Sequence, residues 1–308
     1  MRFAFVLVLL SITFGSPVHA QLPFSATENT AADVVDMVRP AVVQVGVEIT
    51  DSSMIPAIPY SLAPCFRDLP VCVVGTGFFV NDSGDIVTAC HVANGFHELG
   101  DGSKPGVQQI IQLLEATAIH AIAVVGVNLP DVETPRLRIT SAMRFFPATL
   151  VAMDAAHDIA VFRATVNPFT NMDTLLIVPN IAGIPHARAK FVKLDSRRPR
   201  DTEEIFACGF PFGEPGLVTT LGAIASAGKT EKLVTDASEA FPWPVDVYWA
   251  DLRINPGNSG GPVFRMKDHT VVGVAVEAWG SLGIIVPAKY VVEFLNAQAI
   301  KFSSAETN

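Results

Sequence analysis

The sequence predicts an all-β fold in two lobes, followed by a C-terminal helix. Apolar segments of strand length recur between residues 41 and 286, separated by stretches rich in Gly, Pro, Asn and Asp. Three polar residues in short, distinctive contexts, His91, Asp158 and Ser259, stand 67 and 101 residues apart. Such gaps are typical of side chains that different strands and loops of a two-lobed β protein bring to one place.

The first 20 residues are interpreted as a secretory signal peptide. Arg2 is followed by an apolar segment from Phe3 to Ile12, and Val18 and Ala20 place small residues at the −3 and −1 positions. The apolar segment is too short to span a bilayer, and an uncleaved anchor is the alternative. We therefore expect an exported protein, periplasmic or extracellular, that has no membrane span after cleavage.

Residues 21–40 are expected to form an N-terminal arm and a short helix that Pro40 ends. The first lobe is assigned to residues 41–185. Its strands are expected at 41–49, 73–80, 86–90, 121–127, 135–140, 147–153 and 159–164.

Residues 97–130 are interpreted as an insertion in this lobe. Four apolar residues inside it recur at helical spacing, namely Val107, Ile110, Ile111 and Leu114. This predicts an amphipathic helix over residues 106–119. Such a stripe usually packs in the local core, and a flap that contacts substrate or a partner is the alternative.

The second lobe is assigned to residues 186–297. Its strands are expected at 204–209, 217–226, 246–251, 262–265, 270–277 and 283–286. Pro287 then opens a helix whose apolar face carries Val291, Val292 and Leu295 and should pack on this lobe. Residues 298–308 are expected to be a tail.

Residues 255–262, Asn-Pro-Gly-Asn-Ser-Gly-Gly-Pro, place Ser259 in a glycine-flanked turn. There a hydroxyl can project while backbone N–H groups converge beside it, as an attacking serine and an oxyanion hole both require. The same residues fit the Gly-x-Ser-x-Gly elbow of α/β-hydrolases, which needs its acid and histidine after the serine. Only His269 follows Ser259, ten residues on, too near to come from a separate late loop.

Five segments resemble the HtrA/Deg branch of chymotrypsin-fold serine proteases: 75–80, 157–161, 209–213, 254–262 and 283–287. The resemblance covers roughly residues 30–297, and the serine block is its most specific part. It implies two six-stranded antiparallel, chymotrypsin-like β-barrels with a C-terminal helix. About 21 residues follow position 287, so we expect no PDZ domain.

The resemblance also implies a serine endopeptidase that works through an acyl-enzyme. Ser259 would attack a peptide carbonyl, His91 would act as general base and then acid, and Asp158 would orient His91. The N–H groups of Gly257 and Ser259 would form the oxyanion hole. Asp154 and Asp173 are fallback acids, and His157 should point away from the site.

Asn258 stands where digestive trypsin relatives carry an Asp that pairs with a newly cut N-terminus. An amide cannot form that ion pair, so we expect control by loop ordering rather than by propeptide cleavage.

By the same resemblance, substrate would contact Ile254, Val276, Ala278 and Leu282. These uncharged side chains favour a small or medium apolar P1 residue. Arg253 disfavours Lys or Arg at P1, while an inward-pointing Glu277 would reverse this. Val276 and Ala278 are expected to pair with the substrate backbone.

Composition bears on nucleic-acid binding, metal binding and disulfide formation. Loss of Arg2 with the signal takes the formal net charge from −9 to −10, which disfavours nucleic-acid binding because phosphate contacts need a basic face. The four cysteines do not have zinc-site spacing, and we expect neither a metal nor a cofactor. A local Cys65–Cys72 bridge is plausible, with Cys90 and Cys208 as buried thiols, but the sequence does not fix the pairing.

The expected partners are peptide or unfolded-protein substrates. HtrA relatives are commonly trimers, and the sequence leaves a homotrimer and other states equally open. Two rival functions remain: a catalytically weak chaperone-like or peptide-binding relative of the same fold, and an esterase that uses the same serine.

Overall fold

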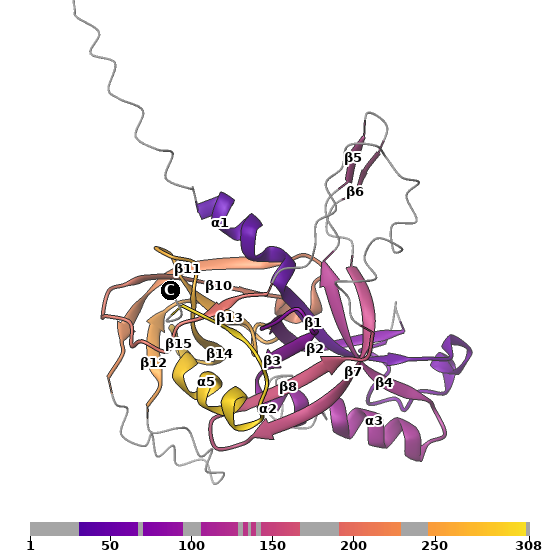
Figure 1. The fold of residues 1–308 in the computed structure, drawn as a ribbon. Coiled ribbons are helices and arrows are strands. Elements are labelled where there is room, and N and C mark those ends of the chain that lie inside the picture. The colour runs from indigo at the N-terminus through magenta and orange to yellow at the C-terminus, as the bar shows by residue number, and fades with distance from the viewer. Residues whose placement is uncertain are drawn as a thin grey trace, which may run out of the picture.

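The computed structural model describes residues 31–66, 70–94, 106–128, 132–134, 137–139, 143–166, 191–228 and 246–305. The predicted signal peptide and residues 21–30 of the expected arm lie outside these residues. Two β-barrels lie side by side, the first coloured indigo to magenta and the second orange to yellow (Figure 1). No helix among the described residues is long and apolar enough to cross a membrane.

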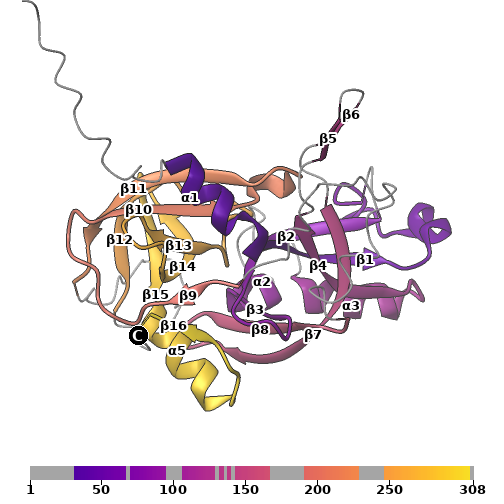
Figure 2. The ribbon, with the colours of Figure 1, turned by 45° about the horizontal axis from the view of Figure 1, so that its top comes forward.

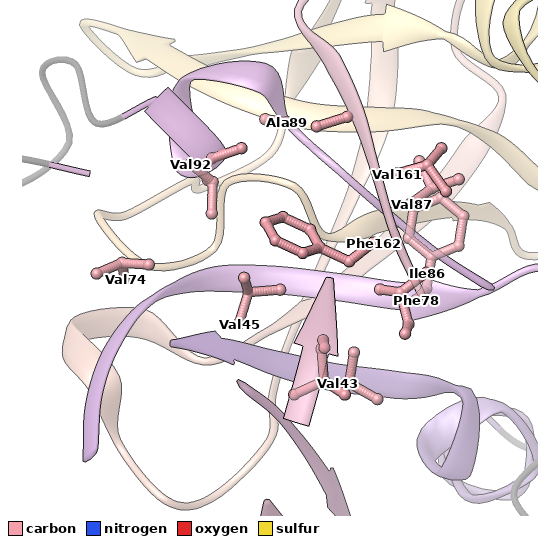
Figure 3. Close-up of a cluster of buried hydrophobic side chains, with 14 of the residues drawn as sticks. Val43, Val45, Val74, Phe78, Ile86, Val87, Ala89, Val92, Val161 and Phe162 are labelled. Atoms are coloured by element: carbon pink, nitrogen blue, oxygen red, sulfur yellow. The ribbon is translucent and has the colours of Figure 1, made fainter. Parts of the chain in front are cut away.

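The first barrel is closed by six antiparallel strands, in the order β1-β2-β3-β8-β7-β4. The strands are β1 (Val42–Ile49), β2 (Val71–Phe79), β3 (Asp85–Thr88), β4 (Ala121–Asn128), β7 (Met143–Asp154) and β8 (Ile159–Ala164). Valine and phenylalanine side chains fill the interior, where β-branched and aromatic residues suit a pleated, buried surface. Figure 3 shows Val45, Phe78 and Phe162 meeting there.

The second barrel is also closed by six antiparallel strands. They are β10 (Glu204–Gly209), β11 (Val218–Ser226), β12 (Tyr248–Asp251), β13 (Pro262–Arg265), β14 (Val271–Trp279) and β15 (Leu282–Pro287). Their order is β13-β10-β11-β12-β15-β14, and the β13–β14 pairing closes the ring. The expected fold class of two six-stranded chymotrypsin-like barrels is therefore confirmed.

Short helices cover the barrels. They are α1 (Ala31–Val38), η1 (Arg39–Ala41), η2 (Ser52–Ala57), α2 (Cys90–Asn94), α3 (Val107–Ala116), η4 (Pro211–Gly213) and α5 (Ala288–Ala297). In α3, Val107, Ile110 and Leu114 are buried in the core, as the apolar stripe indicated. α5 buries Val291, Phe294 and Leu295, and so confirms the predicted C-terminal helix.

Two expectations for the first lobe differ from the structure. The predicted barrel strand at 135–140 is wrong: β5 (Val132–Thr134) and β6 (Leu137–Ile139) pair only with each other and project from the barrel (Figure 1). Pro130 and Pro135 bound these short strands in the sequence, and proline cannot donate to a strand ladder. The second is the extent of the insertion assigned to residues 97–130. β4 lies within it and is a barrel strand paired with β1 and β7, as the strand predicted at 121–127 indicated.

Segments far apart in sequence meet at the seam between the barrels. β9 (Lys193–Leu194) pairs in parallel with β14 and with β16 (Ser303–Ser304), which lies beside it in Figure 2. Asn81 of the first barrel donates from Nδ2 to the carbonyl of Lys301 at 2.8 Å. Residues 301–304 of the predicted tail are thus bound to both halves of the molecule.

A buried ion network lies next to β9. Asp195 is almost fully buried and accepts hydrogen bonds from Arg197 and from Arg265 on β13. Burial acts to raise the pKa of Asp195, but the bonds from Arg197 and Arg265 outweigh it and lower that pKa to about 2. The carboxylate is therefore ionised throughout the physiological pH range.

Candidate active site

His91 and Asp158 meet at one end of the first barrel. His91 lies on α2, directly after β3, and Asp158 lies in the turn that leads from β7 into β8. Oδ2 of Asp158 lies 2.6 Å from Nδ1 of His91, and Oδ1 accepts the His91 backbone N–H at 2.8 Å. The two side chains are only 8% and 13% exposed. The carboxylate therefore fixes both the ring and the backbone of His91.

The backbone of Asp158 is in the left-handed region, with φ +53°. Residues other than glycine rarely adopt this conformation, and aspartate tolerates it better than most. The two hydrogen bonds to His91 hold it there. Such conformations often mark functional positions in a fold.

The neighbouring His157 turns the other way, as expected from its place beside Asp158. Its Nδ1 lies 2.7 Å from Oδ2 of Asp154, whose other oxygen accepts the N–H groups of Ala156 and His157. Its ring stacks on Tyr290 of α5, with centroids 4.1 Å apart. The turn that carries Asp158 is thus tied to the helix of the second barrel, and Asp154 is engaged by His157.

Ser259 lies at the seam and contacts both barrels. Its carbonyl accepts the N–H of Thr76 on β2 at 2.9 Å, and its hydroxyl donates to the carbonyl of Val276 on β14 at 2.8 Å. Gly260 is in the left-handed region with φ +81°, and a Cβ there would lie 2.1 Å from Thr88 Oγ1 and 2.9 Å from the Ala89 nitrogen. Glycine is therefore required at 260 for the serine turn to approach the chain that leads into His91.

Three successive carbonyls of the serine turn are each held by a donor. The Pro256 carbonyl accepts the Phe212 N–H at 2.7 Å, the Gly257 carbonyl accepts the Thr76 hydroxyl at 2.6 Å, and the Asn258 carbonyl accepts the Gly261 N–H at 2.9 Å.

In a trans peptide the C=O and the following N–H point in opposite directions. The held carbonyls of Pro256 and Asn258 therefore fix the directions of the N–H groups of Gly257 and Ser259. Among the described residues, neither of these two N–H groups donates a hydrogen bond. This is the arrangement that an oxyanion site needs.

The four predicted substrate contacts fall in different places. Ile254 and Ala278 line a cavity of about 680 Å³, together with Arg253 and Asp251. Val276 is buried, and its carbonyl accepts the Ser259 hydroxyl. Leu282 is half-buried and pairs with Trp279 across β14 and β15. Neither Val276 nor Leu282 is among the residues lining the cavity.

The two edges of β14 are paired to different extents. Residues 277–279 pair with β15 along one edge, whereas the pairing of the other edge with β13 ends at Val274. An extended peptide can add to such an edge.

The cysteines are separate from this chemistry. Cys65 and Cys72 form a disulfide, the local bridge considered in the sequence, and Cys90 and Cys208 are buried free thiols. Burial, and then the charges of Asp158 and Asp154, raise the pKa of Cys90 to about 11. Burial likewise raises the pKa of Cys208 to about 11. Both thiols are protonated at neutral pH and are poor nucleophiles.

The structure also reveals residues that sequence reasoning missed. Thr76 and Phe212 hold the serine turn, and Tyr290 stacks on His157. Thr76 lies within the 75–80 segment and Phe212 within the 209–213 turn, both of which had been noticed only for their resemblance. Asp173, the second fallback acid, lies outside the described residues.

Two closed six-stranded barrels, with a His–Asp pair on one and a glycine-flanked serine at the seam, define a chymotrypsin-like serine protease fold. The chain belongs to the family of trypsin-like peptidase domains. Residues 75–274, about two thirds of the chain, match that family. Its relatives make it HtrA-like within that family, as the sequence motifs indicated.

One relative is serine protease HTRA3 of Homo sapiens, 24% identical over 270 residues, which cover 87% of this chain and 44% of HTRA3. Another is a probable periplasmic serine endoprotease DegP-like of Pseudomonas putida, 42% identical over 84 residues, covering 27% of this chain and 16% of that protein. The chain thus spans less than half the length of HTRA3. The active form of Rv3671c protease from M. tuberculosis superposes with a TM-score of 0.52 at 18% identity, covering 92% of this chain and 95% of that one, and so shares the fold.

Proposed function

We propose that this chain is an exported serine endopeptidase that hydrolyses peptides or unfolded proteins through a Ser259-His91-Asp158 triad. The observation that carries the proposal is the double hydrogen bond from His91 to Asp158, on the barrel against which the Ser259 turn packs. Membership of the trypsin-like peptidase family supports the reaction class.

The contacts of His91 suit a general base. With Nδ1–H donated to the Asp158 carboxylate, the neutral ring has Nε2 as its acceptor nitrogen. The Ser259 hydroxyl has a single proton, which the bond to Val276 engages. Attack requires the hydroxyl to turn from the Val276 carbonyl to Nε2 of His91. We expect this rotation when substrate binds along β14.

The reaction then proceeds in two balanced steps. The Ser259 oxygen bonds to the scissile carbonyl carbon as its proton passes to His91, and the peptide C–N bond breaks as that proton passes to the leaving amine. Water then attacks the carbonyl carbon of the acyl-enzyme as its proton passes to His91, and the ester bond to Ser259 breaks as His91 returns that proton to the Ser259 oxygen, which releases the new carboxyl terminus. In both steps the N–H groups of Gly257 and Ser259 stabilise the oxyanion, at about 3 kcal/mol or more for one donor.

Substrate recognition is assigned to the cavity and to the edge of β14. Ile254 and Ala278 give the cavity an apolar wall that suits a small or medium apolar P1 side chain, while the opposite charges of Arg253 and Asp251 in the same lining offset each other. The residues beside Ala278 offer backbone groups to an extended substrate. Cleavage of a peptide library strictly after Lys or Arg would overturn this assignment.

A fluorophosphonate probe tests the proposal. Wild-type protein should be labelled and Ser259→Ala should not be. The matched control Ser83→Ala alters an exposed serine of the first barrel outside the candidate site and should be labelled like wild type. Casein cleavage should follow the same pattern. Absence of wild-type labelling and cleavage would reject the enzyme.

One observation favours a second candidate, a peptide-binding or chaperone-like relative with weak catalysis. The Ser259 hydroxyl donates to Val276, a bond that would keep the serine at rest. This candidate predicts suppressed aggregation of an unfolded protein, equally by wild type and by Ser259→Ala, without labelling. Hydrolysis of short acyl esters without any casein cleavage would instead favour an esterase.

Export and assembly belong to the same proposal. The N-terminal signal pattern, and relatives named as probable periplasmic proteases, support export, and N-terminal sequencing of the secreted form should begin at Gln21. A homotrimer is tested by sedimentation, which should give three times the mass of one chain.

A further inference from the structure

We propose that Thr76 is a positioning residue for the oxyanion site, holding the serine turn from the opposite barrel. The inference rests on the proposed serine endopeptidase activity and assigns part of it to a residue outside the triad. Thr76 lies on β2 of the first barrel and is fully buried.

Thr76 contacts both sides of the candidate oxyanion site. Its hydroxyl donates to the carbonyl of Gly257 at 2.6 Å, and its backbone N–H donates to the carbonyl of Ser259 at 2.9 Å. Gly257 and Ser259 carry the two N–H groups assigned to the oxyanion. The Gly257 carbonyl belongs to the peptide unit between these two N–H groups, and the Ser259 carbonyl belongs to the unit that follows them. Thr76 therefore fixes the chain on either side of the Ser259 N–H.

The Thr76 oxygen has a second bond, to the turn that supports Gly257. It accepts the Phe210 N–H at 3.0 Å, and two residues later the Phe212 N–H holds the carbonyl of Pro256. Gln44, which pairs with Thr76 across β1 and β2, donates to the Glu214 carbonyl at 2.9 Å. One rung of the first barrel therefore holds both ends of the 210–214 turn.

The space around Gly257 explains why a hydroxyl is needed. Gly257 has φ +94°, and a Cβ there would lie 2.5 Å from the Phe210 carbonyl and 2.8 Å from the Phe212 nitrogen. Gly257 is thus packed against the 210–214 turn but has no side chain that could fix its conformation. Hydrogen bonds to the carbonyls of its two peptide units therefore restrain their rotation. Without the Thr76 hydroxyl, the Gly257 carbonyl and the Phe210 N–H would both be buried without that hydrogen-bond partner. The desolvation free energy of each group would then be uncompensated.

The experiment compares Thr76→Val with Thr76→Ser. Valine keeps the shape but removes the hydroxyl, so kcat on a peptide chosen from a cleaved library should fall about 100-fold, the effect of misplacing or losing one oxyanion donor. KM should change less than about threefold, because the oxyanion contact strengthens only in the transition state. Serine restores the hydroxyl and should recover kcat to within about tenfold of wild type.

Thr270→Val is the matched control. Thr270 is a buried threonine of the second barrel whose hydroxyl also both donates and accepts, to Asp268 and from Arg265. Its loss should leave kcat within about twofold of wild type. A Thr76→Val variant that folds with wild-type kcat, or one whose kcat serine does not recover, overturns the proposal.

A second readout is independent of activity. The amide of Phe210 should exchange with solvent faster in Thr76→Val than in wild type and in Thr76→Ser, as measured by hydrogen exchange. If wild type neither reacts with the probe nor cleaves casein, the proposed function fails, while this measurement still tests whether the Thr76 hydroxyl holds the turn. Unchanged exchange at Phe210 in Thr76→Val overturns that role of the hydroxyl in either case.

Discussion

At the scale of the residue, the sequence could nominate the candidate residues and the contact between His91 and Asp158, but not the other contacts at the seam. His91, Asp158 and Ser259 were identified from short contexts, and the structure places Asp158 on both the ring and the backbone of His91. The bond from Ser259 to Val276 was not foreseeable, because a hydroxyl rotates among several acceptors. Leu282 pairs with Trp279 across β14 and β15 and does not line the cavity, and its contact with substrate stays a prediction.

Asp158→Asn should lower kcat about 10⁴-fold with little change in fold, because an amide favours the wrong tautomer of His91. Steady-state cleavage of the library-derived peptide measures this loss. Asp154→Asn serves as the comparison, since Asp154 bonds to His157 rather than to His91. A larger loss in Asp154→Asn than in Asp158→Asn would transfer the role of the acid to Asp154.

Cys90 should resist alkylation although it adjoins His91. Burial and the nearby carboxylates of Asp158 and Asp154 raise its thiol pKa to about 11, so little thiolate is present at pH 8. Iodoacetamide followed by mass spectrometry should show no modification of Cys90 or Cys208 in folded protein, and full modification of both in urea. Rapid labelling of Cys90 in the folded state would contradict the burial described here.

At the scale of the element, helices and strands were predicted most accurately where hydrophobic periodicity and turn residues agreed. α3 and α5 have apolar faces at helical spacing, and both form with most of those faces buried, Ile111 and Val292 being partly exposed. The error at 135–140 arose because a short apolar segment has the same pattern in a projecting hairpin as in a barrel strand. Thr76 was missed for a related reason: a threonine in a β-strand is ordinary, and only the docking of the second barrel gives its hydroxyl an acceptor.

The contact between α5 and the Asp158 turn can be tested at Tyr290. Tyr290→Ala removes the stack on His157, which is worth about 0.5–1.5 kcal/mol. Tm should fall by about 2–5 °C, and kcat should fall because the turn that orients His91 loses a support from the second barrel. Calorimetry and peptide cleavage measure the two effects.

Tyr290→Phe is the control for that change. It keeps the ring on His157 and removes only the hydroxyl that donates to Asp246 at 3.3 Å. It should retain most of the kcat of wild type. Equal kcat in Tyr290→Ala and wild type would show that the stack supports stability alone.

At the scale of the whole molecule, the ion network around Asp195 links β9 to the second barrel and should set the acid limit of stability. The pKa of Asp195 is about 2 in the folded protein and about 3.9 in an unfolded chain. Its contribution is therefore present above about pH 4 and is lost as pH falls toward 2. Urea unfolding at pH 7 and at pH 3 should show this loss.

Asp195→Asn should remove that contribution at every pH. It leaves the buried Arg265 without one of its carboxylate partners, which costs about 3–5 kcal/mol at pH 7. The difference in unfolding free energy between wild type and variant should shrink at pH 3. A difference that stays constant from pH 7 to pH 3 would mean that the Asp195 charge does not stabilise the fold.

The division of the site between two barrels affects when activity can first appear. The base, its carboxylate and Thr76 come from the barrel that leaves the ribosome first, and the nucleophile comes from the later one. Under the proposed function, a nascent chain with only its first half folded holds no complete relay and cannot attack the proteins around it. The two barrels expressed as separate chains should each be inert alone and should regain probe labelling only when they associate. Labelling of Ser259 would then measure the association of the barrels.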